Sequence, residues 1–161
     1  MKVILKKYNK IEESILILSL IINVIIVFAQ VIMRYFFNTS ITWSEELSRY
    51  IFIWQVWLGT SIAFVEEQHI NVDLIYSLIK SKKGQKFIDI FRYVVWLLFN
   101  LYLIKVGFEL VNSMAARNAL SSGMRIPLVY VYSVLPISAI LLSIRILDKL
   151  FDIIKRDFSR D

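Results

Sequence analysis

Four long apolar segments, separated by charged connections, constrain the fold of this chain more than any other feature of its sequence. A membrane-spanning helix needs roughly 20 residues, because each residue advances it by about 1.5 Å through a hydrocarbon layer about 30 Å thick. The chain is 58% hydrophobic with a mean hydropathy of +0.63, too much apolar surface for 161 residues to bury in a soluble core. We therefore predict one all-α membrane domain over residues 1–161, with four spans at about residues 14–37, 47–65, 87–111 and 126–147.

Lysine and arginine gather in three places, and this distribution predicts the orientation. Basic clusters lie in the N-terminal segment, in the connection after the second span and in the C-terminal tail, whereas the other connections carry only a pair each. Because strongly basic connections stay in the cytoplasm, we predict that both termini are cytoplasmic. The net charge of +6 is then explained by orientation, and no nucleic-acid partner is expected.

The segment between the second and third spans matches neither a loop nor a span. Its apolar residues occupy one broad arc of a helix over about residues 70–81, and Asp73 lies on the other arc. This pattern predicts an amphipathic helix in the inner membrane interface, with Lys82 and Lys83 meeting lipid headgroups. His69 precedes it, and a lone histidine there is expected to cap the helix or lie at the interface; a pH sensor or metal ligand is the alternative.

Polar residues follow one face of each of the first two spans. In the first span, four of them fall within about 60° of arc: Ser19, Asn23, Gln30 and Arg34. Amides facing lipid are costly, so this face should contact protein, either within this chain or on a partner subunit. The second span carries a similar face, formed by Ser48, Gln55, Gly59, Ala63 and Glu66. The small residues Gly59 and Ala63 would let two helices approach closely.

The stretch from Arg34 to Glu46 is predicted to be a short polar hinge at the outer membrane face. Trp43 suits an interfacial anchor. The charged residues around the hinge are expected to form a local ion-pair cluster; they are Arg34, Glu45, Glu46 and Arg49. Two adjacent carboxylates alone would make a poor cation site.

The third and fourth spans each contain one irregular feature. Lys105 and Glu109 lie four residues apart, and we expect them to form a surface ion pair. The lipid-embedded part of the helix would end near Ile104, and the helix would continue beyond the lipid with this pair. A proton relay is the alternative. Ser121-Ser122-Gly123 should break that helix.

Two prolines bear on the fourth span. Pro127 should lie in its first turn, and Pro136 should kink it and free the carbonyl of Tyr132, which Ser133 could satisfy. The span should then continue through Arg145 into a solvated charged tail.

The composition excludes several kinds of chemistry. There is no cysteine, which rules out disulfides and thiolate sites, and the single histidine cannot supply a bis-histidine haem. A small membrane enzyme would need clustered ionisable side chains, and the candidates for such a cluster are Glu66, Glu67, His69 and Asp73. A self-assembling pore is a further alternative. We expect no catalytic residue, cofactor or metal in this chain.

Three stretches together resemble one transporter family. They are Arg34-Tyr35-Phe36-Phe37-Asn38 with Trp43-Ser44-Glu45-Glu46-Leu47 and Arg49-Tyr50; Leu58-Gly59 through Glu66 with His69-Ile70 and Val72-Asp73; and Arg125-Ile126-Pro127 with Tyr130-Val131-Tyr132 and Leu135-Pro136-Ile137. With these residues the chain resembles the small membrane subunit of tripartite ATP-independent periplasmic (TRAP) transporters. The likeness extends over most of the chain from Arg34 to about Ile137.

The resemblance implies a function that composition does not show. It implies a multi-pass protein of the bacterial inner membrane that braces a large multi-span subunit, which holds the sodium and substrate sites. A periplasmic protein would deliver an organic acid anion, such as a dicarboxylate or sialic acid. The residues expected at subunit interfaces or in structural roles are Asn23, Gln30, Arg34, Trp43, Glu45, Glu46, Arg49, Gln55, Gly59, Asp73, Pro127 and Pro136.

Overall fold

A computed structural model describes residues 2–39, 41–66 and 81–158. These residues form helices joined by loops, with a single isolated β-bridge between Leu120 and Pro127. The helices are α1 (Lys2–Phe36), α2 (Thr42–Glu66), α4 (Lys82–Ala116), α5 (Leu128–Tyr132) and α6 (Val134–Phe158). The predicted all-α architecture is thus confirmed. Apart from Ser81, the predicted interfacial helix over residues 70–81, with His69 before it and Asp73 within it, lies outside the described residues.

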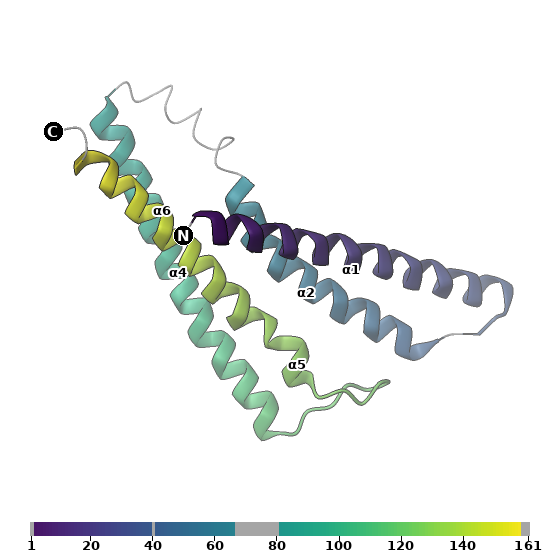
Figure 1. The fold of residues 1–161 in the computed structure, drawn as a ribbon. Coiled ribbons are helices and arrows are strands. Elements are labelled where there is room, and N and C mark those ends of the chain that lie inside the picture. Colours follow the sequence, from purple (N-terminus) through teal and green to yellow (C-terminus); the bar gives the residue numbers. More distant parts are fainter. Residues whose placement is uncertain (1, 40, 67–80, 159–161) are drawn as a thin grey trace.

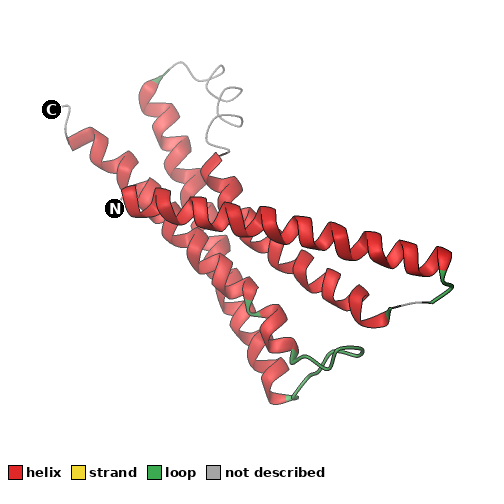
Figure 2. Ribbon diagram, turned by 45° about the vertical axis from the view of Figure 1, so that its right-hand side comes forward, coloured by secondary structure: helices red, strands yellow, loops and turns green. Residues whose placement is uncertain are grey.

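The helices are arranged as two hairpins that diverge like the arms of a V (Figure 1). α1 packs against α2, α4 packs against α5 and α6, and α2 contacts α6 where the arms meet. The described loop residues 37–39 and 117–127 lie toward the open end of the V, as a second view also shows (Figure 2). The two loops that we predicted on one side of the membrane therefore lie at the same end of the molecule.

Three segments of the described helices are long and apolar enough to cross a membrane: Lys10–Phe36, Gly84–Ala116 and Leu128–Lys155. They correspond to the first, third and fourth predicted spans. α2 has 25 residues, but its composition leaves it outside this group. Its polar side chains include Ser48, Gln55 and Ser61, and all three bond to neighbouring helices.

The small apolar core is centred on α6. Phe64, Tyr93, Leu142 and Ile146 form its buried cluster, and the rings of Phe64 and Tyr93 meet edge to face with centroids 6.1 Å apart. α1 differs sharply, because between residues 15 and 29 every exposed side chain of this helix is apolar. Such a surface suits a hydrocarbon solvent.

Among the described glycines, Gly107 lies closer than Gly59 to atoms of a neighbouring helix. A Cβ atom added to Gly107 would lie 2.4 Å from Cδ2 of Leu135 and 3.1 Å from the backbone nitrogen of Pro136. A Cβ atom at Gly59 would meet only Cδ1 of Leu16, at an ordinary 3.9 Å. Within the described chain Gly59 therefore makes an ordinary contact with α1, and a closer approach of another helix at this residue stays a prediction.

Pro127 and Pro136 lie near the starts of α5 and α6, and their positions differ from the predicted first turn and mid-helix kink. Pro127 is the N-cap of α5, one residue before the first turn. The helix is interrupted at Ser133, so Pro136 falls in the first turn of α6, where its ring does not disrupt an established helix. The Ser133 hydroxyl donates to the carbonyl of Tyr130 at 3.0 Å, not to that of Tyr132 as predicted.

α4 ends earlier than the Ser121-Ser122-Gly123 segment suggested. Asn118 adopts a left-handed conformation with φ 45°, its N–H donates to the Ala115 carbonyl at 3.0 Å, and the N–H of Ala119 donates to the Met114 carbonyl at 3.0 Å. This is a Schellman motif, and asparagine tolerates the left-handed position well. Asn38, just after α1, is likewise left-handed with φ 51°.

Candidate functional site

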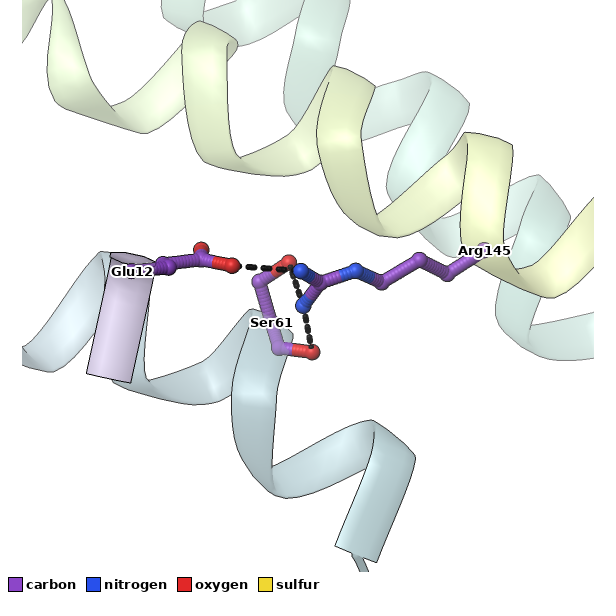
Figure 3. Close-up of polar contacts among 3 residues, drawn as sticks. All are labelled: Glu12, Ser61 and Arg145. Atoms are coloured by element: carbon purple, nitrogen blue, oxygen red, sulfur yellow. Dashed lines mark hydrogen bonds and ion pairs between the residues drawn. The ribbon is translucent and has the colours of Figure 1, made fainter. Parts of the chain in front are cut away.

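A buried arginine joins three helices where the arms of the V meet. Arg145 of α6 donates to the carboxylate of Glu12 in α1, and to the backbone carbonyl and the hydroxyl of Ser61 in α2, the last at 2.7 Å (Figure 3). Arg145 and Glu12 are only 7% and 5% exposed, and Ser61 is fully buried. We call these three residues the junction. It fixes the first hairpin to the second.

The junction was not predicted, because Arg145 was interpreted only as part of the end of the fourth span, where it leads into a charged tail. A signal for its burial was present, because Arg145 follows Leu142 by three residues and so shares a helical face with a core side chain. In a low-dielectric environment two paired charges attract each other strongly, and removing one of them leaves the other buried without a partner at a large cost in stability. The second carboxylate oxygen of Glu12, Oε1, is buried and bonds to none of the described residues.

Two further polar contacts hold the first hairpin together. The Ser48 hydroxyl donates to Oδ1 of Asn23 at 2.7 Å, and Nε2 of Gln55 donates to the Ser19 hydroxyl at 3.0 Å. Asn23 and Gln55 therefore both find hydrogen-bond partners within the chain.

The other polar residues of the first span differ from this pair. Gln30 is half-buried, and its Nε2 atom bonds to none of the described residues. Arg34 is exposed at the outer end of α1.

At the open end of the V, one carboxylate holds the loop over residues 117–127, which we call the outer loop after its predicted side of the membrane. Glu46, in the first turns of α2, accepts the backbone N–H of Gly123 at 2.8 Å and that of Met124 at 2.9 Å. We call this contact the outer clamp. The Met124 and then the Gly123 N–H groups lower the pKa of the Glu46 carboxyl, because they stabilise its charged form. The clamp joins the two hairpins a second time, far along the arms from the junction.

The predicted ion-pair cluster at the outer hinge is wrong. Arg34, Glu45 and Arg49 are exposed, and within the described ranges none of them forms an ion pair. Glu46 is bound by backbone amides instead of by an arginine. Trp43 is exposed next to the clamp, and its role as an interfacial anchor stays a prediction.

The loop that the clamp holds is well ordered by its own hydrogen bonds. The N–H of Ser121 donates to the Ile126 carbonyl at 2.9 Å, and that of Leu128 donates to the Ala119 carbonyl at 2.9 Å. Arg125 is left-handed with φ 52°, an uncommon conformation for arginine. Backbone hydrogen bonds and the clamp therefore define the conformation of this loop at the open end of the V.

In the described ranges, no group of three or more histidine, aspartate or glutamate side chains could hold a metal ion. The structure does not describe the side chains of the candidate enzyme cluster, which are those of Glu66, Glu67, His69 and Asp73. Lys105 and Glu109 form the predicted exposed ion pair, with Nζ and Oε1 3.9 Å apart.

Known proteins agree with the resemblance seen in the sequence. A relative from Haemophilus influenzae, provisionally named a TRAP transporter small permease protein, is 45% identical over 67 residues, 42% of either chain. The C4-dicarboxylate TRAP transporter small permease protein DctQ of Vibrio cholerae is 34% identical over 70 residues, 44% of this chain and 30% of the relative. The sialic acid TRAP transporter permease protein SiaT of Haemophilus influenzae is 28% identical over 141 residues.

These matches cover less than half of each relative's length, and the SiaT match covers 88% of this chain but only 22% of SiaT. The family model described as "Tripartite ATP-independent periplasmic transporters, DctQ component" matches residues 23–156, which is well over half of the chain. The chain therefore belongs to the DctQ family, the small permease components of TRAP transporters.

Proposed function

We propose that this small permease subunit is a rigid brace for a large membrane subunit, in a sodium-coupled transporter that imports an organic acid anion. The observation that carries the brace is the pair of ties between the hairpins. The junction joins α1, α2 and α6, and the outer clamp joins α2 to the loop after α4. Two ties at separate points along two arms prevent the arms from rotating freely, as a fixed scaffold requires.

The relative lengths support a large partner. A match that covers 88% of this chain occupies only 22% of SiaT, and a similar match occupies 23% of the isethionate TRAP transporter permease protein DctMQ of Oleidesulfovibrio alaskensis. In those permeases the counterpart of this chain is thus a minor part of one long polypeptide. We infer that the remainder corresponds to a separate large subunit here, which would hold the sodium and substrate sites.

The proposed substrate class rests on the names of the relatives. They are named for sialic acid, C4-dicarboxylate and isethionate, which are all organic anions. An organic acid anion is the class that they share. A soluble periplasmic binding protein would deliver it, and the fixed outer loop with the exposed Arg117 and Arg125 would help that protein to dock.

We propose that α2 spans the membrane as well, which gives four spans with both termini in the cytoplasm of the bacterium. α2 lies between two apolar helices, and its polar groups are bonded to α1 and α6 rather than directed to lipid. Single cysteines test this topology. Cysteine at Thr39 or Ser122, which are both exposed, should react with an impermeant reagent outside the cell, and cysteine at Lys7 or Lys83 should not; the reverse pattern would overturn the orientation.

Co-purification and transport test the brace directly. A tagged copy of this chain, co-expressed with the large permease subunit of its transporter, should retain that subunit through purification in detergent. Vesicles with both subunits and the binding protein should take up the organic anion when a sodium gradient is imposed, and vesicles with this chain alone should not. Uptake by this chain alone, or recovery without the large subunit, would contradict the proposal.

A further inference from the structure

α4 carries an exposed seam that the rest of the described chain leaves uncovered. Its residues follow steps of three and four, the spacing of a helix–helix contact: Phe87, Phe91, Val94, Leu98, Tyr102, Lys105, Glu109 and Asn112, all exposed. The opposite face holds Tyr93, Asn100 and Gly107, which are buried. α4 is therefore an edge helix with one packed face and one open face.

The packing of Gly107 shows how deep the charged part of this seam lies. Gly107 lies against Leu135 and Pro136. The apolar segment of α5 and α6 begins at Leu128, so Pro136 is about 12 Å along it at about 1.5 Å per residue. Lys105 and Glu109 flank Gly107 by two residues each and share its level. They therefore lie beside the apolar part of α6, whereas we expected the lipid-embedded part of the helix to end near Ile104.

Charges at this level need polar surroundings. The side chains of Lys105 and Glu109 are 75% and 65% exposed, and they point away from α6. A charged side chain in contact with hydrocarbon is costly, and such residues normally face protein or water. The exposed side of α1 shows the contrasting case, because from residue 15 to 29 it is entirely apolar and suited to lipid.

We propose that a transmembrane helix of the large permease subunit covers this seam of α4 and places polar groups opposite Lys105 and Glu109. The identity of the partner rests on the proposed function, whereas the choice of the face rests on the exposed charges, their depth and the three-four spacing. Lipid is a poor occupant because it offers no groups that bind both charges at this depth.

Site-specific photo-crosslinking tests the face with a matched control. p-Benzoylphenylalanine replaces Tyr102 in the seam or Phe28 on α1; both are aromatic, and they are 62% and 64% exposed. After co-expression with the large subunit and irradiation, the Tyr102 variant should give a crosslink to that subunit and the Phe28 variant should not. A crosslink from Phe28 alone, from neither position, or from Tyr102 to a second copy of this chain would overturn the assignment of the face.

Removing both charges gives opposite results for a protein-covered and a lipid-covered seam. The double variant Lys105→Leu/Glu109→Leu should recover several-fold less large subunit than the wild-type chain, because polar groups of the partner lose their counterparts. On a lipid-facing surface the same change would remove a cost, and recovery would stay equal or rise, which would contradict the inference. If the wild-type complex forms but these tests fail, only the face is wrong; if no complex forms, the proposed brace fails and the inference falls with it.

Discussion

Replacing Arg145 by methionine should destabilise the chain more than any comparable change at its surface. Methionine keeps much of the side-chain volume but leaves the Glu12 carboxylate buried without its partner, while Oε1 of Glu12 has no bond to the described residues even before the change. Ser61 also loses a donor to its carbonyl and hydroxyl. Breaking a buried ion pair from one side typically costs about 3–5 kcal/mol, and we expect a loss in that range.

Glu12→Met and the double variant Glu12→Met/Arg145→Met complete a double-mutant cycle with Arg145→Met. Both should lose less free energy of unfolding than Arg145→Met does. Glu12→Met leaves the arginine bonded to Ser61, so the loss should be about 1.5–3 kcal/mol, the value of a hydrogen bond to a charged group. In the double variant no buried charge lacks its partner, and the free energy of unfolding should return to within about 1 kcal/mol of the wild type. The two single losses should therefore be far from additive.

Reversible unfolding of the purified chain by SDS in mixed micelles measures these differences. Arg117→Met is the matched control, because the Arg117 side chain is exposed and bonds only to Ser113 among the described residues; its loss should cost no more than about 0.5 kcal/mol. If Arg145→Met cost no more than the control, or if the double variant lost the sum of the single effects, the junction would not hold the hairpins as we argue.

Two further predictions concern a glycine and the outer clamp. Gly107→Ala should cost about 1–3 kcal/mol in the same assay because its Cβ would overlap Leu135, whereas Gly59→Ala should be neutral or stabilise α2 by up to about 1 kcal/mol; equal effects would contradict the packing described. Glu46→Gln should speed hydrogen exchange in the outer loop at neutral pH, and the neighbouring Glu45→Gln should not. The pKa of Glu46 is lowered in the folded state, so the wild-type clamp should be complete above the usual carboxyl pKa. It should be lost only as the pH falls through the lowered value. Fast hydrogen exchange of the wild-type loop at neutral pH would refute the clamp.

The helical class, and the need of the polar face of α1 for a protein neighbour, could be predicted from local periodicity. Asn23 and Gln55 were recognised as polar groups that need partners, and they bond to the facing helix. Hydropathy alone places three helices in the membrane range and leaves out α2, because the groups that join α2 to its neighbours lower its apolar character.

The ties between the hairpins could not be predicted in the same way. Glu12 and Arg145 are 133 positions apart, and Glu46 meets Met124 across 78 positions. No periodic pattern relates such distant residues. Arginines near Glu46 suggested an ion pair, but backbone amides of a tight loop satisfied the carboxylate instead, and this alternative depends on the loop conformation that Asn118 and Arg125 create.

The order in which the ribosome makes these residues gives the junction a consequence for membrane insertion. Glu12 and Ser61 both emerge long before Arg145, so a nascent chain holds an uncompensated carboxylate near the bilayer until its final helix arrives. A polypeptide cut short before that arginine would expose this carboxylate permanently.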